Sequence, residues 1–204
     1  MAASEEPIML YSPSKRVKLT RPDTKLDEAI AALRCAPTTL EYLKILPAHF
    51  TAEEAKARRE SRAKDATILD LYAFALNEGG EYELAGPTGV FSVDNFHKTC
   101  EAGIIIAPKF LGKGLTAENF YTLFQYIFEE KGFHRISFET SAENEPMRGW
   151  FEKVAGIRQE GLRKEWWMDG LGGWTDVASY AILEREWNAE VKARLEKRIR
   201  VKSS

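Results

Sequence analysis

Glycines and basic residues are concentrated in the segment 108–116, between an apolar run and a helical pattern. Gly112 and Gly114 would let the backbone approach a ligand closely and turn its N–H groups toward that ligand. A helix that begins at Thr116 adds a positive end that favours a phosphate group. The segment therefore has the chemistry of a pyrophosphate cradle, although a strand-to-helix turn also uses glycine for purely steric reasons.

The spacing narrows the identity of the phosphate ligand. The Walker A pattern G-x-x-x-x-G-K-[ST] is not met, whereas residues 112–117 match the dinucleotide pattern G-x-G-x-x-G/A. That pattern normally follows its strand directly, but residues 108–111 intervene here, and too few strand–helix units follow for a doubly wound domain. NAD is therefore disfavoured, and coenzyme A is the third ligand to consider.

The elements that must position this loop alternate between strand and helix. Strands are predicted from β-branched, aromatic or alternating residues, and helices from capping boxes and apolar stripes. The helix after the loop would carry one stripe from Phe120 to Phe128 and end at Gly132. The pattern predicts a mixed-sheet α/β (α+β) domain. The predicted strands are 17–19, 68–76, 82–93, 100–107, 135–140, 157–167 and 174–183, and the predicted helices begin at Thr38, Thr51, Thr116 and Pro146.

Composition limits the classes of function. The chain has 204 residues, 44% of them hydrophobic, and a net charge of -2, so one folded domain is expected without the basic excess of a nucleic-acid-binding protein. The apolar runs are far shorter than the ~20 residues that a membrane helix needs, and the N-terminus lacks the pattern of a signal peptide. Two distant cysteines and three scattered histidines predict neither a disulfide framework nor a metal site. We expect a cytoplasmic protein that binds neither membrane nor nucleic acid.

Several short motifs, taken together, resemble the acyl-CoA-binding core of the GNAT superfamily of acetyltransferases. The run from Glu101 to Pro108 is followed by Lys-Phe-Leu-Gly-Lys-Gly, with Lys109 in the first place of the R/Q-x-x-G-x-G/A signature. Gly-Phe-His-Arg-Ile at 132–136, Ala-Glu-Asn at 142–144 and the ending at 174–187 are similar to the RimJ/RimL-type branch. The resemblance implies a GNAT-like, mostly antiparallel twisted sheet flanked by helices, and an acetyl-CoA-dependent N-acetyltransferase.

The resemblance also implies where acetyl-CoA binds. Asn144 matches the asparagine that hydrogen-bonds the pantetheine in the family, and it is equally suited to cap a helix. The pantetheine arm would follow the backbone of Ile104, Ile105, Ile106 and Ala107, and the pyrophosphate would lie on the loop and helix start formed by Lys109, Leu111, Gly112, Lys113, Gly114, Leu115 and Thr116.

Catalytic residues follow from the same resemblance. Glu101 matches the acidic residue that accepts the proton of the amine, directly or through water, although a strand-end carboxylate satisfied by neighbouring amides is the alternative. Two usual proton donors to the leaving thiolate are missing, because Phe151 and Met147 stand where a tyrosine and a serine are common. Phe151 is counted with the residues that line the cofactor site, and Tyr180 is the substitute donor unless it only packs.

An aromatic and acidic cluster corresponds to the acceptor side of the family's site. Trp166, Trp167, Trp174 and Asp176 flank a glycine-rich turn and suit a cationic amine, such as a protein N-terminus or a small-molecule amine. Some of these tryptophans could equally be ordinary core residues. The leading hypothesis is direct acetyl transfer to a primary amine, and the alternative is a GNAT-fold module that binds CoA with little or no turnover.

The two ends of the chain are expected to differ from the domain at 17–187. Residues 1–16 are polar and predict a flexible arm, whereas residues 188–204 predict a basic helix. The apolar stripe Trp187, Val191, Leu195 and Ile199 is expected to lie on the domain or on a second subunit of a homodimer, rather than on a polyanion or a membrane. A monomer and a homodimer remain equally open.

Overall fold

A computed structural model describes residues 8–170 and 172–203. Within them one sheet has eight strands in the order β1-β2-β3-β4-β5-β6-β8-β7, and neighbouring strands are antiparallel except for the parallel pair β5–β6. The strands are β1 (Met9–Tyr11), β2 (Val17–Thr20), β3 (Leu69–Leu76), β4 (Tyr82–Asp94), β5 (Thr99–Ile104), β6 (Arg135–Ser141), β7 (Gln159–Met168) and β8 (Trp174–Leu183). The predicted mixed, mostly antiparallel sheet is confirmed.

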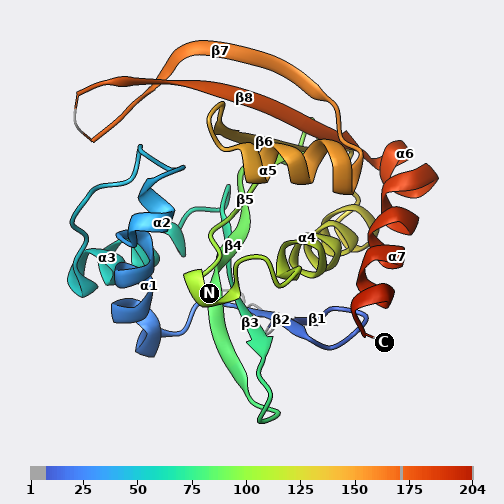
Figure 1. The fold of residues 1–204 in the computed structure, drawn as a ribbon, viewed down its shortest axis with the longest axis horizontal. Helices are drawn as coiled ribbons and strands as arrows, with labels where there is room; N and C mark the ends of the chain where they lie inside the picture. The colour runs from blue at the N-terminus through green and yellow to red at the C-terminus, as the bar shows by residue number, and fades with distance from the viewer. Residues whose placement is uncertain (1–7, 171, 204) are drawn as a thin grey trace.

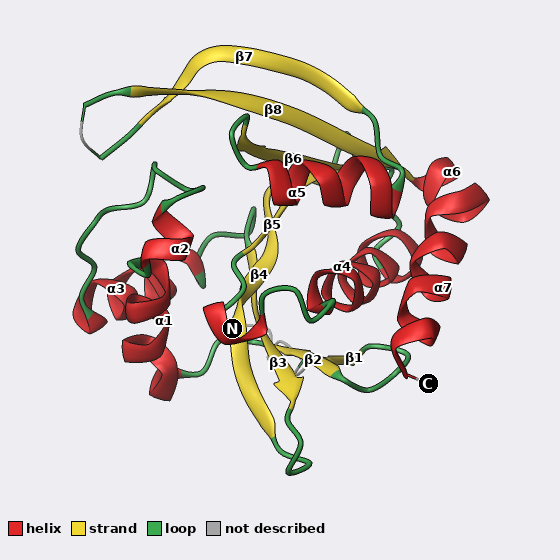
Figure 2. Cartoon of the chain, viewed as in Figure 1, coloured by secondary structure: helices red, strands yellow, loops and turns green. Residues whose placement is uncertain are grey.

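Helices cover both faces of the sheet (Figures 1 and 2). On one side of β3, β4 and β5 lie α1 (Asp27–Arg34), α2 (Pro37–Leu40) and α3 (Ala52–Arg62). On the other side lies α4 (Leu115–Gln125), which continues as a π-helical turn over Tyr126–Glu130. The remaining helical segments are Thr24–Leu26, Pro108–Phe110, α5 (Glu145–Gly149) with Trp150–Ala155, α6 (Glu184–Glu186) with Trp187–Val191, and α7 (Lys192–Ser203).

The main core lies between the sheet and α4. All five residues of the predicted stripe of this helix are buried, and Phe120 stacks on Phe124 with ring centroids 5.1 Å apart. Both rings contact Phe138 of β6, whose buried residues alternate with partly exposed ones as the strand period requires. Gly132 follows the helix with a φ of 64°, which confirms the predicted left-handed helix end.

Three of the predicted helix starts are each off by one residue, and one of them is α5, which begins at Glu145 instead of Pro146. The helix expected at Thr116 begins at Leu115 with Gly114 as its N-cap, because Gly114 adopts a φ of 81° and completes the turn one residue earlier. The helix expected at Thr38 is a single turn that begins at Pro37, and the neighbouring Thr39 donates its hydroxyl to the Leu33 carbonyl instead of capping. The capping box at Thr51 is confirmed, with side-chain and backbone bonds in both directions to Glu54.

The segment expected to be a flexible arm is ordered from residue 8 onward. Met9–Tyr11 pairs with β2, and Ser12 is buried and donates to Glu118 of α4 at 2.8 Å. The polar composition misled the prediction, because these serines satisfy a buried carboxylate rather than solvent. Residues 1–7 of the predicted arm lie outside the described residues.

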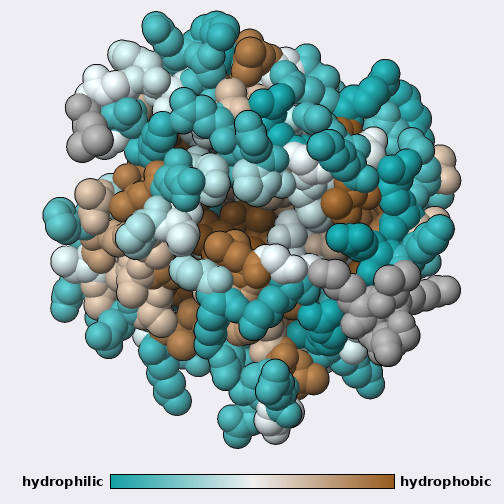
Figure 3. Space-filling view, in the orientation of Figure 1, coloured by the Kyte–Doolittle hydropathy of each residue, from teal (hydrophilic) through white to brown (hydrophobic). Residues whose placement is uncertain are grey.

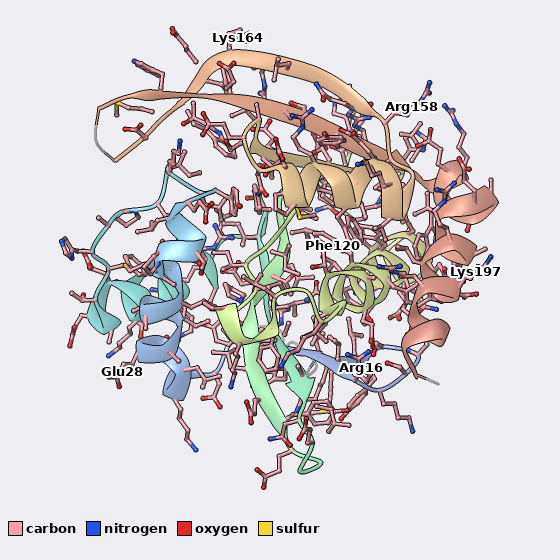
Figure 4. The ribbon with its side chains drawn as sticks, viewed as in Figure 1. Arg16, Glu28, Phe120, Arg158, Lys164 and Lys197 are labelled. Carbon is pink, nitrogen blue, oxygen red and sulfur yellow. The ribbon has the colours of Figure 1, made fainter. Side chains whose placement is uncertain are left out.

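The C-terminal helix packs on its own domain. Trp187, Val191, Leu195 and Ile199 are all at most 3% exposed, so the predicted apolar stripe does lie on the body of the protein. Tyr121 of α4 and Trp187 contact each other with ring centroids 5.5 Å apart. Lys197 lies on the opposite face of α7 and points away from the domain (Figure 4). The helix is therefore part of the fold.

Candidate active site

The site begins where β5 parts from β6. These strands pair from Thr99 only as far as Glu101, which lies opposite Ser137. Beyond that point β5 stays close to β4, because Gly86 has no side chain: a Cβ there would lie 1.9 Å from the Ile105 carbonyl oxygen. The glycine therefore allows this segment to lie close to β4.

The segment that follows β5 remains extended. The strand predicted to reach residue 107 ends at Ile104, but Ile105 and Ala107 still donate their amides to β4 carbonyls at 3.0 and 2.7 Å. Because peptide groups alternate in direction along an extended chain, Ile104 and Ile106 direct theirs away from β4. On that side the pairing with β6 has ended, so an extended ligand could add to the sheet there.

The loop after this segment offers backbone amides. Gly112 and Gly114 have φ values of 73° and 81°, and a Cβ at Gly112 would meet no atom within 4 Å. Gly114 is the N-cap of α4 and supplies no side chain to the first turn, so the amides at that helix start are not capped by a side chain. Leu111 and Lys113 are exposed, whereas Leu115 is buried and Thr116 is partly buried. This arrangement fits the pyrophosphate of coenzyme A.

The two lysines of the loop have different partners. Lys109 makes an ion pair with Glu83 of β4 and lies over the Phe110 ring. Lys113 also lies over that ring, at 5.6 Å, and has no ion pair among the described residues. Lys113 is therefore the cation more available to a phosphate.

Two residues that were not predicted from the sequence, Arg16 and Glu118, support this loop. Arg16 donates from Nη2 to the Lys113 carbonyl at 3.3 Å and pairs through Nη1 with Glu118 at 3.1 Å. Glu118 lies in the first turn of α4, is 1% exposed and also accepts from Ser12 and Ser14. An acidic residue inside an apolar helix was the signal for Glu118, but nothing in the sequence linked it to Arg16.

Glu101 lies on the sheet face opposite the main core. Its neighbours Cys100 and Ala102 are buried in that core, so the alternation of the strand turns Glu101 to the other face, where it is half-buried. Burial raises the pKa of the Glu101 carboxyl, and the nearby Arg163 guanidinium partly opposes that shift. A carboxylate that holds its proton more tightly than usual is a stronger base, as proton transfer from an amine requires.

Arg163 of β7 lies near Glu101 and contacts several residues around it. Its Nη2 makes an ion pair with Glu139 of β6 and donates to Ser179 of β8 at 3.1 Å. Its guanidinium lies 4.5 Å from the ring centroid of Trp166, which is 53% exposed. The structure therefore brings Trp166 and the Glu101 face together.

The other predicted acceptor residues lie further along the β7–β8 hairpin. Trp174 is exposed and Trp167 is partly buried, and they lie near the ends of the two strands that face each other. Asp176 accepts from Lys164 Nζ at 2.7 Å and from the Glu165 amide, and both contacts lower the pKa of its carboxyl. The turn of this hairpin contacts the α2–α3 loop, because the Gly170 amide donates to the Lys44 carbonyl at 3.1 Å.

Tyr180 and Phe151 lie on the core face, away from Glu101. Tyr180 is fully buried, stacks on Phe151 at 4.7 Å and donates its hydroxyl to Glu152 at 2.6 Å. Burial and the Glu152 carboxylate raise the pKa of that hydroxyl. Phe151 is 2% exposed and also contacts Phe138. The structure therefore does not bring Tyr180 and Glu101 together.

Asn144 serves the fold as a helix cap. Its Oδ1 accepts from the Met147 amide at 3.1 Å at the start of α5, and its Nδ2 donates to Thr140 at 2.9 Å. The N-cap alternative is confirmed, and a second contact with pantetheine stays a prediction.

Seen from the front, the molecule is hollowed between α5 and the Pro108–Phe110 turn, and the floor of the hollow is apolar (Figure 3). A wide groove of about 730 Å³ also runs along α1 beside the start of this turn, with Ala29, Leu33, Leu84, Ala107 and Lys109 among its walls. Large apolar space therefore adjoins the Pro108–Phe110 turn, at the start of the glycine loop.

Comparison with known proteins decides the family. Residues 16–156, more than half of the chain, match the family model described as the acetyltransferase (GNAT) domain. The chain belongs to the GNAT acetyltransferases. The predicted family and the predicted class of enzyme, an acetyl-CoA-dependent N-acetyltransferase, are confirmed.

Individual GNAT proteins resemble the chain to different degrees. The uncharacterized N-acetyltransferase YnaD of Bacillus subtilis is 37% identical over 90 residues, 44% of this chain and 52% of YnaD, so the match spans about half the length of that relative. Mycobacterium smegmatis RimJ in complex with CoA-disulfide has a TM-score of 0.77 and 20% identity, covering 95% of this chain and 94% of RimJ. Vibrio cholerae spermidine N-acetyltransferase in complex with CoA and spermine has a TM-score of 0.75 and 20% identity, covering 85% and 98%.

The described residues contain neither a cluster of metal ligands nor a membrane-spanning helix. Among residues 8–170 and 172–203, no group of three or more histidine, cysteine, aspartate or glutamate side chains could hold a metal ion. No helix in the same part of the GNAT chain has the length and apolar character to span a bilayer.

Proposed function

We propose that this GNAT protein transfers an acetyl group from acetyl-CoA directly to a primary amine, with Glu101 accepting the proton of that amine. The observation that carries the proposal is the position of Glu101, half-buried at the last β5–β6 pair and followed in the chain by the amide cradle. Acetyl-CoA supplies a thioester whose acyl carbon the amine attacks and whose thiolate leaves.

The chain's own residues support the binding of that substrate. The amides around Gly112 and Gly114 and the uncapped start of α4 suit the pyrophosphate, with Lys113 as the nearest cation without an ion pair in the described structure. The extended segment from Ile104 to Ala107 suits the pantetheine arm, because half of its peptide groups face away from β4. Arg16 steadies the cradle from its contact with the Lys113 carbonyl.

Glu101 must accept a proton because an amine is nucleophilic only when uncharged. Lysine-like amines have a pKa near 10.4 and α-amines near 8, so most acceptors arrive protonated at neutral pH. Burial raises the pKa of Glu101 and makes the carboxylate a better base for that proton. The thiolate is a fair leaving group, and the proposal assigns it no proton donor, because Tyr180 lies on the core face with its hydroxyl on Glu152.

The surroundings of Glu101 favour a cationic acceptor. The exposed rings of Trp166 and Trp174 offer faces to an ammonium group, and the carboxylates of Glu139 and Asp176, paired with Arg163 and Lys164, could exchange those partners for a cationic substrate. Relatives of the same fold are named for a polyamine and for the RimJ class. An acceptor screen should therefore contain polyamines, amino acids and peptides with free N-termini.

The experiment measures release of CoA from acetyl-CoA with and without each amine. Amine-dependent release that falls in Glu101→Gln at unchanged CoA affinity supports the proposal. The alternative is a module that binds CoA without turnover. Met147 and Phe151 favour it, because these apolar side chains stand at the two positions where the family usually has a proton donor. CoA binding without amine-dependent release by any acceptor would favour that alternative.

A further inference from the structure

A second cluster of charges lies between α1, α3 and the sheet. It surrounds a pocket of about 50 Å³, and its walls include Arg34, Arg58, Tyr72 and Phe50. A cavity of this volume exceeds the 10–15 Å³ that one water molecule requires, so it could hold a small ion. The GNAT reaction described above uses none of these residues.

The cations of this pocket outnumber its anions by two. Arg59 is paired with Asp27 by two bonds of 2.9 Å. Arg62 is paired with Asp70 by bonds of 2.6 and 2.7 Å.

Arg34 and Arg58 remain, and neither has a carboxylate or hydrogen-bond partner within the described part of the chain. Arg34 Nε is sealed from solvent without an acceptor, and its guanidinium lies 5.2 Å from the centroid of the Phe50 ring, which offers a π face but no oxygen.

Unpaired, half-buried guanidinium groups side by side are costly. Burial and the charges of Arg34 and Arg62 lower the pKa of Arg58 to about 10. Burial and Arg62 likewise lower the pKa of Arg34. Each guanidinium presents a planar fork of donors that suits the oxygens of a carboxylate or a phosphate.

The phenol of Tyr72 is the third donor group of this pocket. Tyr72 is 5% exposed on β3 and lines the same pocket, and no hydrogen bond of its hydroxyl occurs among the described residues. Burial raises the pKa of that hydroxyl to about 12, so it stays a donor at any physiological pH.

We infer that the pocket of Arg34, Arg58 and Tyr72 binds a small oxyanion of the size and charge of phosphate. A dianion would balance the two unpaired cations, and its several oxygens would accept from both guanidinium groups and from the phenol. A chloride ion would balance only one of the two charges, and it lacks the several oxygens that two guanidinium forks and a phenol can bind.

The site also has a structural consequence for the acceptor side. Phe50 directly precedes Thr51, the N-cap of α3, and ends the loop whose Lys44 carbonyl contacts the β7–β8 turn. An anion held by Arg34 beneath Phe50 would therefore stabilise the end of that loop.

The test titrates inorganic phosphate into the full chain and follows binding by calorimetry and the melting temperature, with chloride salts holding the ionic strength constant. The melting temperature of the wild type should rise with phosphate. Arg34→Gln and Arg58→Gln should each weaken phosphate binding at least about tenfold, the fold-change expected for the loss of a charge-assisted hydrogen bond.

Controls separate this pocket from other sites. Arg185→Gln removes the same charge from an exposed position on α6 and should bind phosphate like the wild type. Gly114→Val alters the cradle near α4 and should leave this phosphate response in place. Arg58→Lys keeps the charge without the fork and should bind with intermediate affinity.

A reversal in stability is the sharper signature. Without phosphate, Arg58→Gln should melt at the same temperature as the wild type or higher, because it removes an unpaired buried charge. With saturating phosphate the wild type should melt higher than the variant. Equal losses of stability in both buffers would show that Arg58 only packs, and an unchanged phosphate response in both glutamine variants would overturn the site.

Phosphoserine forms a second arm of the titration. Tighter binding of phosphoserine than of phosphate, lost in Arg58→Gln, would identify a phosphorylated molecule as the source of the oxyanion. Tighter binding of inorganic phosphate would identify the free ion. Either result requires the same two arginines, and therefore supports the site.

Discussion

At the scale of single residues, the proposed chemistry depends on Glu101 and on two glycines. If Glu101 accepts the proton of the amine, Glu101→Gln should lower kcat by ~10²-fold or more, because that is the usual contribution of one acid–base group. The affinity for CoA should not change. The loss should shrink as pH rises, because a growing fraction of the amine is then already uncharged.

The measurement is the initial rate with the best acceptor at several pH values, with CoA affinity from calorimetry. An unchanged rate per folded molecule would contradict the assignment and leave Glu101 as a strand-end carboxylate.

The stability of the fold gives an independent test of the Glu101 environment. Because burial raises its pKa, the folded protein binds this proton more tightly than the unfolded chain does. The contribution of this group to stability therefore falls as pH rises from the usual glutamate range through the raised pKa, and stays low above it. At pH 8 the free energy of unfolding of Glu101→Gln should equal or exceed that of the wild type, as urea denaturation would show.

If Glu101→Gln were clearly less stable than the wild type at pH 8, the carboxylate would have to make a stabilising contact in the folded state. The difference in stability between wild type and Glu101→Gln that burial of the charge causes should diminish at pH 4, where the carboxyl is mostly protonated in both the folded and the unfolded state.

Gly114 affects both the backbone conformation at the start of α4 and the access of a ligand to the amides there. Gly114→Val forces a β-branched side chain into the left-handed region at the start of α4, which costs ~1–2 kcal/mol and places a methyl group beside the amides. The affinity for CoA should fall tenfold or more.

Gly80→Val is the matched control, because Gly80 has the same φ of 82° in the β3–β4 hairpin and open space around it. Gly80→Val should lose a similar amount of stability and keep the wild-type affinity for CoA. Equal CoA affinity in folded Gly114→Val would place the pyrophosphate elsewhere.

The sequence was informative about residues whose role is local. Gly112 and Gly114 were predicted because glycine spacing reports backbone conformation directly. The contacts of Arg16 with Glu118 and of Arg163 with Glu139 were not, because each joins strands or helices that only the fold brings together. Tyr180 lies in the core, as its alternative of packing required, and its role as a substitute proton donor stays a prediction.

At the scale of elements, periodic patterns predicted most strands and the long helix. They failed where tertiary contacts set the end of an element. β5 ends at Ile104, three residues after its pairing with β6 stops at Glu101, and no local pattern contains that divergence. The segment before β2 looked disordered for the same reason, since its serines serve Glu118, more than 100 residues away in the chain.

The C-terminal helix is an element whose removal should be costly. Leu195 is fully buried against the domain, so Leu195→Ala should lower the free energy of unfolding by about 2–5 kcal/mol. Truncation after Asn188 removes Val191, Leu195 and Ile199 together and should lower the melting temperature further or prevent folding.

Lys197→Ala, on the exposed face of the same helix, should change stability little. Retention on heparin should be nearly unaffected by Leu195→Ala. A truncated chain that melts like the full chain but no longer binds heparin would show that the helix is a binding arm instead.

At the scale of the whole molecule, the sheet separates two tasks. One face packs on α4 and carries the core, and the other face carries Glu101 and Arg163 on the side where α1–α3 lie. The place where β5 separates from β6 lies between these two faces of the sheet. A ligand bound at that place can be reached from both faces. A ligand bound there would contact β5, the cradle and α4 at once.

Binding at this junction should therefore stabilise the entire domain. A ligand that binds only the folded protein contributes about 2.7 kcal/mol at one hundred times its Kd, and each kcal/mol shifts the melting temperature of a chain of this size by about 2–4 °C. CoA at that concentration should raise the melting temperature by about 5–10 °C, measured by calorimetry. Gly114→Val should show little shift at the same CoA concentration, whereas Glu101→Gln should show the full shift, because its change affects proton transfer and leaves the cradle intact. A full shift in Gly114→Val, or none in the wild type, would contradict a CoA site at the start of α4.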